Sequence, residues 1–173
     1  TKNDDATDTT EDIDCTEPEL EDGDDCNDPA EPDNDLFDGE LAQNLQFFFW
    51  ADVCDRCDAE PGDNVYQPDC DKFLMSGFAS DIIEQGGKAV YALADSEENN
   101  IGGDPGDPLK GSSTYYIGKM WCFGEIEFDA DGNITGCNGV NVDNKPQTDE
   151  VQGDIEFYAV QQRNNGSFTC EGL

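Results

Sequence analysis

Acidic residues dominate this chain so strongly that only a few stretches are free to build a core. The 173 residues include 42 Asp and Glu against 8 Lys and Arg, with no His, and the formal net charge is −34. A surface this negative repels phosphate backbones, because proteins bind nucleic acid through Lys and Arg. The lack of His removes the Ser/His and Cys/His nucleophile pairs and the His-containing zinc sites. The composition therefore argues against a nucleic-acid partner and against most hydrolase chemistry.

The acids are concentrated at the start of the chain. Residues 1–35 are rich in Asp and Glu, contain Lys2 as their only base, and have little to bury apart from Ile13 and Leu20. Such a segment cannot offset its own ordering entropy, so we expect a solvated acidic loop or arm over residues 1–35. The remaining length suits a single domain over residues 36–173.

Short apolar or alternating stretches occupy the rest of the chain. Residues 40–45 predict one or two helical turns that lead into an apolar strand over residues 46–52, and residues 76–85 predict a second short helix. Further strands are predicted over 88–93, 115–122, 125–128 and about 150–162, with Gly/Pro/Asp loops between them. These features predict an all-β fold, namely a jelly-roll-like antiparallel β-sandwich with one or two short helices and long acidic loops.

An even number of cysteines predicts disulfides and a secreted, extracellular or cell-surface protein. The eight are Cys15, Cys26, Cys54, Cys57, Cys70, Cys122, Cys137 and Cys170. The alternative is zinc or iron–sulfur ligation by Cys54 and Cys57, but no second closely spaced pair follows them. No apolar run approaches the ~18 residues needed to span a bilayer, so we expect no membrane insertion of the mature chain.

Eight cysteines permit 105 connectivities, among which Cys15 with Cys26 and Cys122 with Cys137 are the two candidate pairings. The second depends on the turn that precedes Cys137. A two-residue turn at Asp131-Gly132 would put Cys137 opposite Ile126 and leave Cys122 roughly 13 Å further along the strand, which is too far for a disulfide. That pairing therefore requires a wider or irregular loop.

Two groups of oxygen-bearing side chains are candidate calcium sites. One lies in the loop after the aromatic strand and comprises Asp52, Asp55, Asp58, Asp63 and Asn64; the other has the alternating spacing of a calcium loop and comprises Asp129, Asp131 and Asn133. The alternative for the first group is adaptation to high salt, where acids keep a surface hydrated. The alternative for the second is a polar β-turn, since Asp-Gly is a common hairpin turn. Calcium is the one cofactor considered, and no organic cofactor is expected.

Three other side-chain types were weighed as sites. Asn133 and Asn165 lie in Asn-x-Ser/Thr sequons and are candidate glycosylation sites. A sugar-binding aromatic face would be made by Trp50, Trp121, Tyr115, Phe123 and Phe157, although aromatics on strands are more often core. Among so many carboxylates no acid/base pair stands out, so no catalytic residue is assigned.

Four stretches carry a resemblance to a known family. Residues 146–165, with Phe168-Thr169-Cys170 after them, resemble the C-terminal signature of the TasA/camelysin-like family of secreted fibre proteins. Residues 115–124 look like the strand that precedes that signature, and residues 39–42 and 49–52 look like the family's entry from helix to strand. The resemblance covers roughly residues 36–170.

The resemblance implies a secreted jelly-roll subunit that polymerises into biofilm-matrix fibres or archaeal bundling pili, in some of which an N-terminal strand of one subunit completes the sheet of the next. Family members usually carry strands before the acidic segment, and here no stretch before Leu36 reads as a strand. Either those strands lie upstream of residue 1, or the acidic arm replaces them. The family also carries a metalloprotease label, but a zinc protease commonly needs His ligands, so we expect no enzyme.

The sequence therefore predicts a structural subunit of an extracellular filament whose partners are copies of itself, assembled by donor-strand exchange. The alternative is a monomeric extracellular calcium- or carbohydrate-binding module on the cell surface.

Overall fold

The computed structural model describes residues 2–4, 40–56, 59–84, 88–143, 146 and 150–170. Most of its regular structure is strand, and all paired strands are antiparallel. The elements are β1 (Lys2–Asp4), α1 (Glu40–Asn44), β2 (Leu45–Ala51), β3 (Lys72–Phe78), α2 (Ala79–Glu84), β4 (Ile117–Phe123), β5 (Glu125–Phe128), β6 (Ile134–Asn138), β7 (Glu150–Gln152) and the 3-10 turn η3 (Gln162–Asn164). The chain therefore has a small all-β fold with two short helices, and no helix in these ranges is long and apolar enough to cross a membrane.

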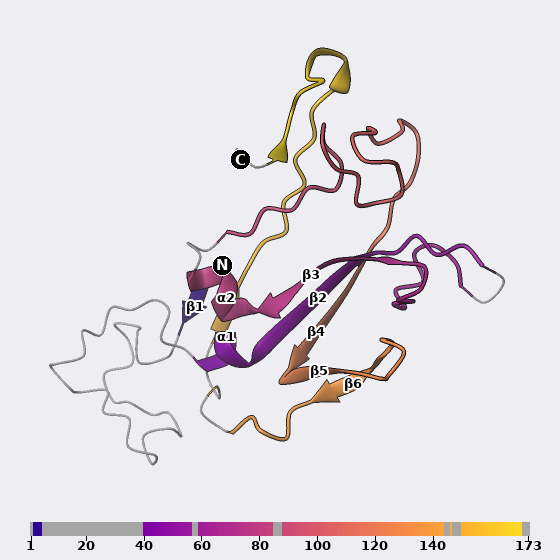
Figure 1. Ribbon diagram of the computed structural model, residues 1–173. Helices are drawn as coiled ribbons and strands as arrows, with labels where there is room; N and C mark the ends of the chain where they lie inside the picture. The colour runs from indigo at the N-terminus through magenta and orange to yellow at the C-terminus, as the bar shows by residue number, and fades with distance from the viewer. Residues whose placement is uncertain are drawn as a thin grey trace, which may run out of the picture.

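A three-stranded sheet forms the centre of the fold, in the order β3-β2-β4 (Figure 1). Its middle strand β2 is the apolar run Leu-Gln-Phe-Phe-Phe-Trp-Ala, which has no charged side chain to keep in water. The predicted strand over 46–52 and the helical turns before it are thus confirmed as β2 and α1. The strand β3 was not predicted, and the helix expected over 76–85 begins only at Ala79.

Both faces of this sheet bury apolar side chains. On one face Phe48 and Trp50 pack with Cys122 and Ile126, and the ring of Tyr66 meets Phe48 edge-on at 4.9 Å between centroids. The other face is covered in two separate places. At one end Ala42 of α1 and Ala79 of α2 pack against it, and at the opposite end Ala51, Leu74 and Ile101 form a third cluster. Between those two clusters, the side chains of Phe47 and Phe49 on β2 and those on the same side of β4 are partly buried or exposed.

Gly118 on β4 lies directly opposite Trp50 on β2, and the indole ring occupies the space that a side chain would need. A Cβ at residue 118 would lie 1.9 Å from Trp50 Cε2 and 2.2 Å from Cζ2. Gly118→Ala is therefore expected to lower the free energy of unfolding by about 3 kcal/mol, because the buried Trp50 cannot move aside.

Urea unfolding followed by tryptophan fluorescence measures this loss. Gly111→Ala is the matched control, since a Cβ there meets no atom within 4 Å. If Gly118→Ala unfolds at the same urea concentration as the control, the close approach of the indole ring is not present in solution.

The hairpin of β5 and β6 folds back over the end of β4, and a glycine makes this possible. Gly124 has a φ of +119°, and a Cβ there would lie 2.2 Å from the carbonyl oxygen of Asn138. The register places Ile126 opposite Cys137, as expected. The strand does not run straight from Cys122 to Ile126, however, because the chain turns at Gly124. Cys122 and Cys137 are therefore disulfide-bonded, with 5.4 Å between their Cα atoms.

The turn of this hairpin is wider than the two residues expected. Residues 129–133 form it: the amide of Gly132 donates to the carbonyl of Asp129, and the amide of Asp129 donates to the carbonyl of Asn133. A register shift between Glu127 and Phe128 absorbs the extra residue.

Two of the predicted strands are largely missing. Residues 88–93 form no strand, and of residues 150–162 only Glu150–Gln152 are paired, as β7. The partner of β7 is β1, at Lys2–Asp4, so a strand does occur before Leu36, contrary to expectation. Ladder bonds use the backbone, which explains why a strand with no apolar side chain escaped prediction. The rest of the predicted acidic arm, with Cys15 and Cys26, lies outside the described residues.

Candidate functional site

The acidic loop between β2 and β3 is organised by a buried carboxylate at its start. Asp52 directly follows β2 and is 1% exposed. Its Oδ1 accepts a hydrogen bond from the amide of Gly62 at 2.8 Å, and its Oδ2 accepts one from the amide of Asn64 at 2.8 Å. Asp52 therefore closes the first half of the loop by satisfying backbone donors.

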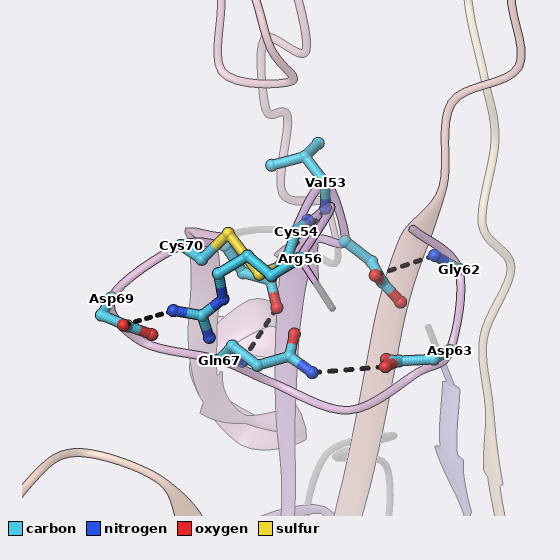
Figure 2. The surroundings of a disulfide bond; sticks show 10 residues. Val53, Cys54, Arg56, Gly62, Asp63, Gln67, Asp69 and Cys70 are labelled. Atoms are coloured by element: carbon cyan, nitrogen blue, oxygen red, sulfur yellow. Dashed lines mark hydrogen bonds and ion pairs between the residues drawn. A yellow bond between two sulfur atoms is a disulfide. The ribbon is translucent and has the colours of Figure 1, made fainter. Parts of the chain in front are cut away.

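A second carboxylate, Asp71, closes the other half of the loop and was not singled out from the sequence. Its Oδ1 accepts hydrogen bonds from the amides of Val53 and Cys54, each at 2.9 Å, and its Oδ2 accepts one from the amide of Gln67 at 2.8 Å. The neighbouring Cys70 is disulfide-bonded to Cys54. Figure 2 shows the Cys54–Cys70 disulfide, with Gln67 and Asp63 bonded to each other in the loop that it closes.

The other predicted ligands of this loop face different partners. Asp63 accepts from the amide of Val65 and from the side chain of Gln67, whereas the side-chain oxygen of Asn64 accepts from the amide of Lys119 on β4. Asp55 is exposed, and Asp58 lies outside the described residues. Within the described ranges no group of three or more acidic or cysteine side chains is placed to hold a metal ion.

The second predicted calcium loop is held together by Asp129. Its Oδ1 accepts hydrogen bonds from the amides of Asp131 and Asn133, each at 2.9 Å, and its Oδ2 accepts one from the Asn133 side-chain amide at 2.9 Å. The Asn133 side chain, followed by its amide, holds the pKa of Asp129 below the ordinary value. The loop thus has the internal bonding of a polar turn, and Asp131 is exposed on it.

This hairpin is expected to lose stability as the pH falls below the ordinary carboxyl value of 3.8. Because the pKa of Asp129 is lower in the folded state than in the unfolded state, the unfolded state takes up the proton first. The stabilisation is present above that value and is lost as the pH falls through the lowered folded pKa. Asp129→Asn should remove this part of the acid sensitivity.

Melting temperatures between pH 6 and about pH 2.5 measure the effect, over the range in which the carboxyl titrates. Asp131→Asn is the control, because no hydrogen bond to the Asp131 carboxylate occurs in the described ranges. Equal acid sensitivity in both variants would rule out the role assigned to Asp129.

Cys170 differs from the other described cysteines because its thiol is free. The eight cysteines were expected to form up to four disulfides. Among the described cysteines, Cys54 is bonded to Cys70 and Cys122 to Cys137, whereas Cys170 is unpaired. Burial, and then the charge of Asp95, raise the pKa of the Cys170 thiol, which keeps it in the less reactive protonated form. Cys57 lies outside the described residues.

The aromatic residues weighed as a sugar-binding face do not come together as one surface. Trp50 is buried against Phe48, and Tyr115 packs against the cluster of Ala51, Leu74 and Ile101. Only Trp121 and Phe123 lie side by side on one strand, β4, where they are 62% and 36% exposed. Phe157 is 68% exposed in the segment after β7.

The two predicted glycosylation sites are exposed turn residues. The side-chain amide of Asn133 donates to Asp129, and that of Asn165 donates to the carbonyl of Gln161 at 2.9 Å. A glycan on either nitrogen would replace one of its two hydrogens.

No protein-family model matches this chain, and neither a curated protein nor a solved structure is significantly similar to it.

Proposed function

We propose that this chain is a structural, non-enzymatic subunit of an extracellular filament, either a pilus or a biofilm-matrix fibre, whose partners are other copies of itself. The observation that carries the proposal is an unclosed sheet. Neither β3 nor β4 has an outer strand partner within the described ranges. A sheet edge with unpaired backbone groups is a template for a strand from another chain.

The half-covered face of the same sheet supports the proposal. Trp121 projects from β4 with 62% of its surface exposed, and Phe123 beside it is 36% exposed. Large exposed apolar side chains next to one another commonly mark an interaction surface. We propose that a neighbouring subunit covers this face and thereby completes a jelly-roll-like sandwich.

The disulfides and the family resemblance are consistent with this function. The Cys54–Cys70 and Cys122–Cys137 disulfides indicate an oxidising environment, in keeping with secretion. Residues 115–124, which resemble the TasA/camelysin-like family, include the whole of β4.

Sedimentation and electron microscopy test the proposal on the protein at its native salt concentration. A filament subunit should pellet and form uniform fibres. A particle that stays near 18.9 kDa at all protein concentrations would overturn the proposal and favour a monomeric calcium- or carbohydrate-binding module.

Calcium remains a second proposal for the turn at residues 129–133, where Asp131 and Asn133 are exposed beside Asp129. A cation bound only to the folded state raises the melting temperature, and the rise grows with the logarithm of its concentration once that exceeds the Kd. Melting in excess Ca²⁺ and in excess chelator should therefore differ. Equal melting temperatures in Ca²⁺ and in chelator would mean that the turn binds no calcium and is held by its hydrogen bonds alone. The many other acidic residues would then be explained by adaptation to high salt.

A further inference from the structure

The segment after β7 has strand-like side chains but no strand partner. Residues 153–160 make no backbone hydrogen bond to another described residue. Ile155 and Phe157 are 60% and 68% exposed, and they alternate with Asp154, Glu156 and Tyr158. In Figure 1 this yellow segment is a drawn-out tube that leads away from β7 without joining a sheet. Within the described ranges its backbone groups are therefore unpaired, and the side chains of Ile155 and Phe157 are largely exposed.

The outer edge of β4 offers the complementary backbone groups. The amide of Lys119 donates to the side chain of Asn64, so it points away from β2. Backbone direction alternates along an antiparallel strand, which means that the N–H and C=O groups of Trp121 and the N–H of Phe123 also point outward. The carbonyl of Phe123 lies against Cys137 and Gly139, so the accessible edge ends there. The pairing of β4 with β2 is unbroken from Ile117 to Phe123, so this edge is regular.

The edge of β3 is less suited to accept a strand. Its register against β2 shifts between Phe49 and Trp50, and such a bulge twists an edge away from further pairing. One outward amide is occupied by a side chain on each edge, Phe78 by Asp81 and Lys119 by Asn64, so the register shift is the feature that separates the two edges.

Charge also favours contact between the segment and the sheet. The three strands β2, β3 and β4 contain Lys72 and Lys119 and no acidic residue, in a chain that has 42 acids. The charged side chains of residues 153–161 are Asp154 and Glu156, both negative. An acidic segment from another copy therefore meets least repulsion at this sheet.

We infer that residues 153–161 of one copy add as a strand to the outer edge of β4 in a second copy, with apolar side chains of the segment beside Trp121 and Phe123. The contact is heterologous, so each copy donates one segment and accepts another, and copies add head to tail into an open filament when the rotation between neighbours does not close a ring. This inference rests on the proposed filament function and names the two surfaces that carry it.

The donor half is tested with Glu156→Pro and Phe157→Pro, because the amides of successive residues point to opposite sides of a strand and only one of the two faces β4. Proline at that residue removes a ladder donor, whereas residues 153–160 make no backbone hydrogen bond to the described part of the same chain that it would disturb. We expect an unchanged melting temperature for both variants, and a fall in sedimentable polymer on the order of tenfold or more for the variant whose amide faces β4. Ala89→Pro is the matched control, because residue 89 is exposed in the other segment that failed to form a strand.

The acceptor half is tested with Trp121→Pro, since the Trp121 amide points outward and its loss leaves the ladder with β2 intact. Trp121→Glu, which puts a charge on the exposed face, replaces it if the proline variant melts early. Each defective variant alone should stay monomeric. A mixture of the defective donor variant and Trp121→Pro copies should form discrete dimers, because each still has one working surface.

The possible outcomes distinguish failure of the proposed filament function from failure of the donor and acceptor assignments. If the unmodified chain does not polymerise, the filament function fails. If it polymerises and both Glu156→Pro and Phe157→Pro do so equally, the filament function stands and the segment is not the donor. If one of these proline variants is defective but its mixture with Trp121→Pro forms no dimers, the acceptor is not the β4 edge.

Discussion

Replacing Asp71 with alanine is expected to lower the free energy of unfolding by about 4 kcal/mol. The Asp71 carboxylate accepts hydrogen bonds from three backbone amides, and it is only 7% exposed. Alanine leaves these amides without partners, and one of them, on Cys54, lies in a fully buried residue. Each buried donor that loses its partner keeps its desolvation cost and gains nothing in return.

Urea or thermal unfolding of Asp71→Ala measures this loss, and Asp69→Ala is the control two residues away. Asp69 pairs with Arg56 at 2.6 Å, but its side chain is 69% exposed, so the variant should unfold together with the unmodified protein. Asp71→Asn should fall between them, since the amide keeps one accepting oxygen. An Asp71→Ala protein as stable as Asp69→Ala would mean that the loop is not closed by this side chain in solution.

Reduction of the two disulfides that lie within the described residues is expected to cost about 3 kcal/mol for each, because each closes a loop of 15 or 16 residues in the unfolded chain. The combined loss of about 6 kcal/mol matches the whole stability of many single domains. The reduced protein should therefore be largely unfolded at 37 °C.

Paired alanine variants divide this effect between the two bonds, one replacing Cys54 and Cys70 and the other Cys122 and Cys137. Cys170→Ser is the control, because it changes a free thiol and removes no cross-link. Circular dichroism with and without reductant is the measurement. Equal melting curves in both conditions would show that the cross-links do not stabilise the fold.

The sequence predicts best those strands whose own side-chain pattern, continuous apolar or alternating, is enough to identify them. β2 has no charged residue, and β5 alternates Glu and apolar side chains in a short hairpin. β3 was missed because Lys72–Phe78 has no clear alternation and becomes a strand by pairing with β2. The strand predicted over residues 150–162 has the right pattern beyond Gln152 but no ladder partner among the residues that the structure describes. A side-chain pattern specifies which face is apolar, whereas a strand also requires a neighbour.

The acidic loops show a similar limit. Asp52 was picked out as a possible cation ligand, and its buried oxygens instead accept backbone amides. Asp71 likewise holds the loop closed by accepting hydrogen bonds from three backbone amides. No spacing in the sequence distinguishes it from the many other acidic residues. A carboxylate that holds a loop and one that stays in water look alike in the sequence, because the difference lies in where the backbone donors point.

Under tension, the two cross-links withhold part of the chain from being drawn out. Their sequence separations of 16 and 15 residues correspond to roughly 100 Å of contour length, at about 3.3–3.6 Å for each residue. Force spectroscopy on a single copy should therefore record an end-to-end extension about 100 Å shorter in the oxidised protein than after reduction. The segments closed by the disulfides, residues 54–70 and 122–137, would each remain a covalently closed loop while the rest of the chain is extended.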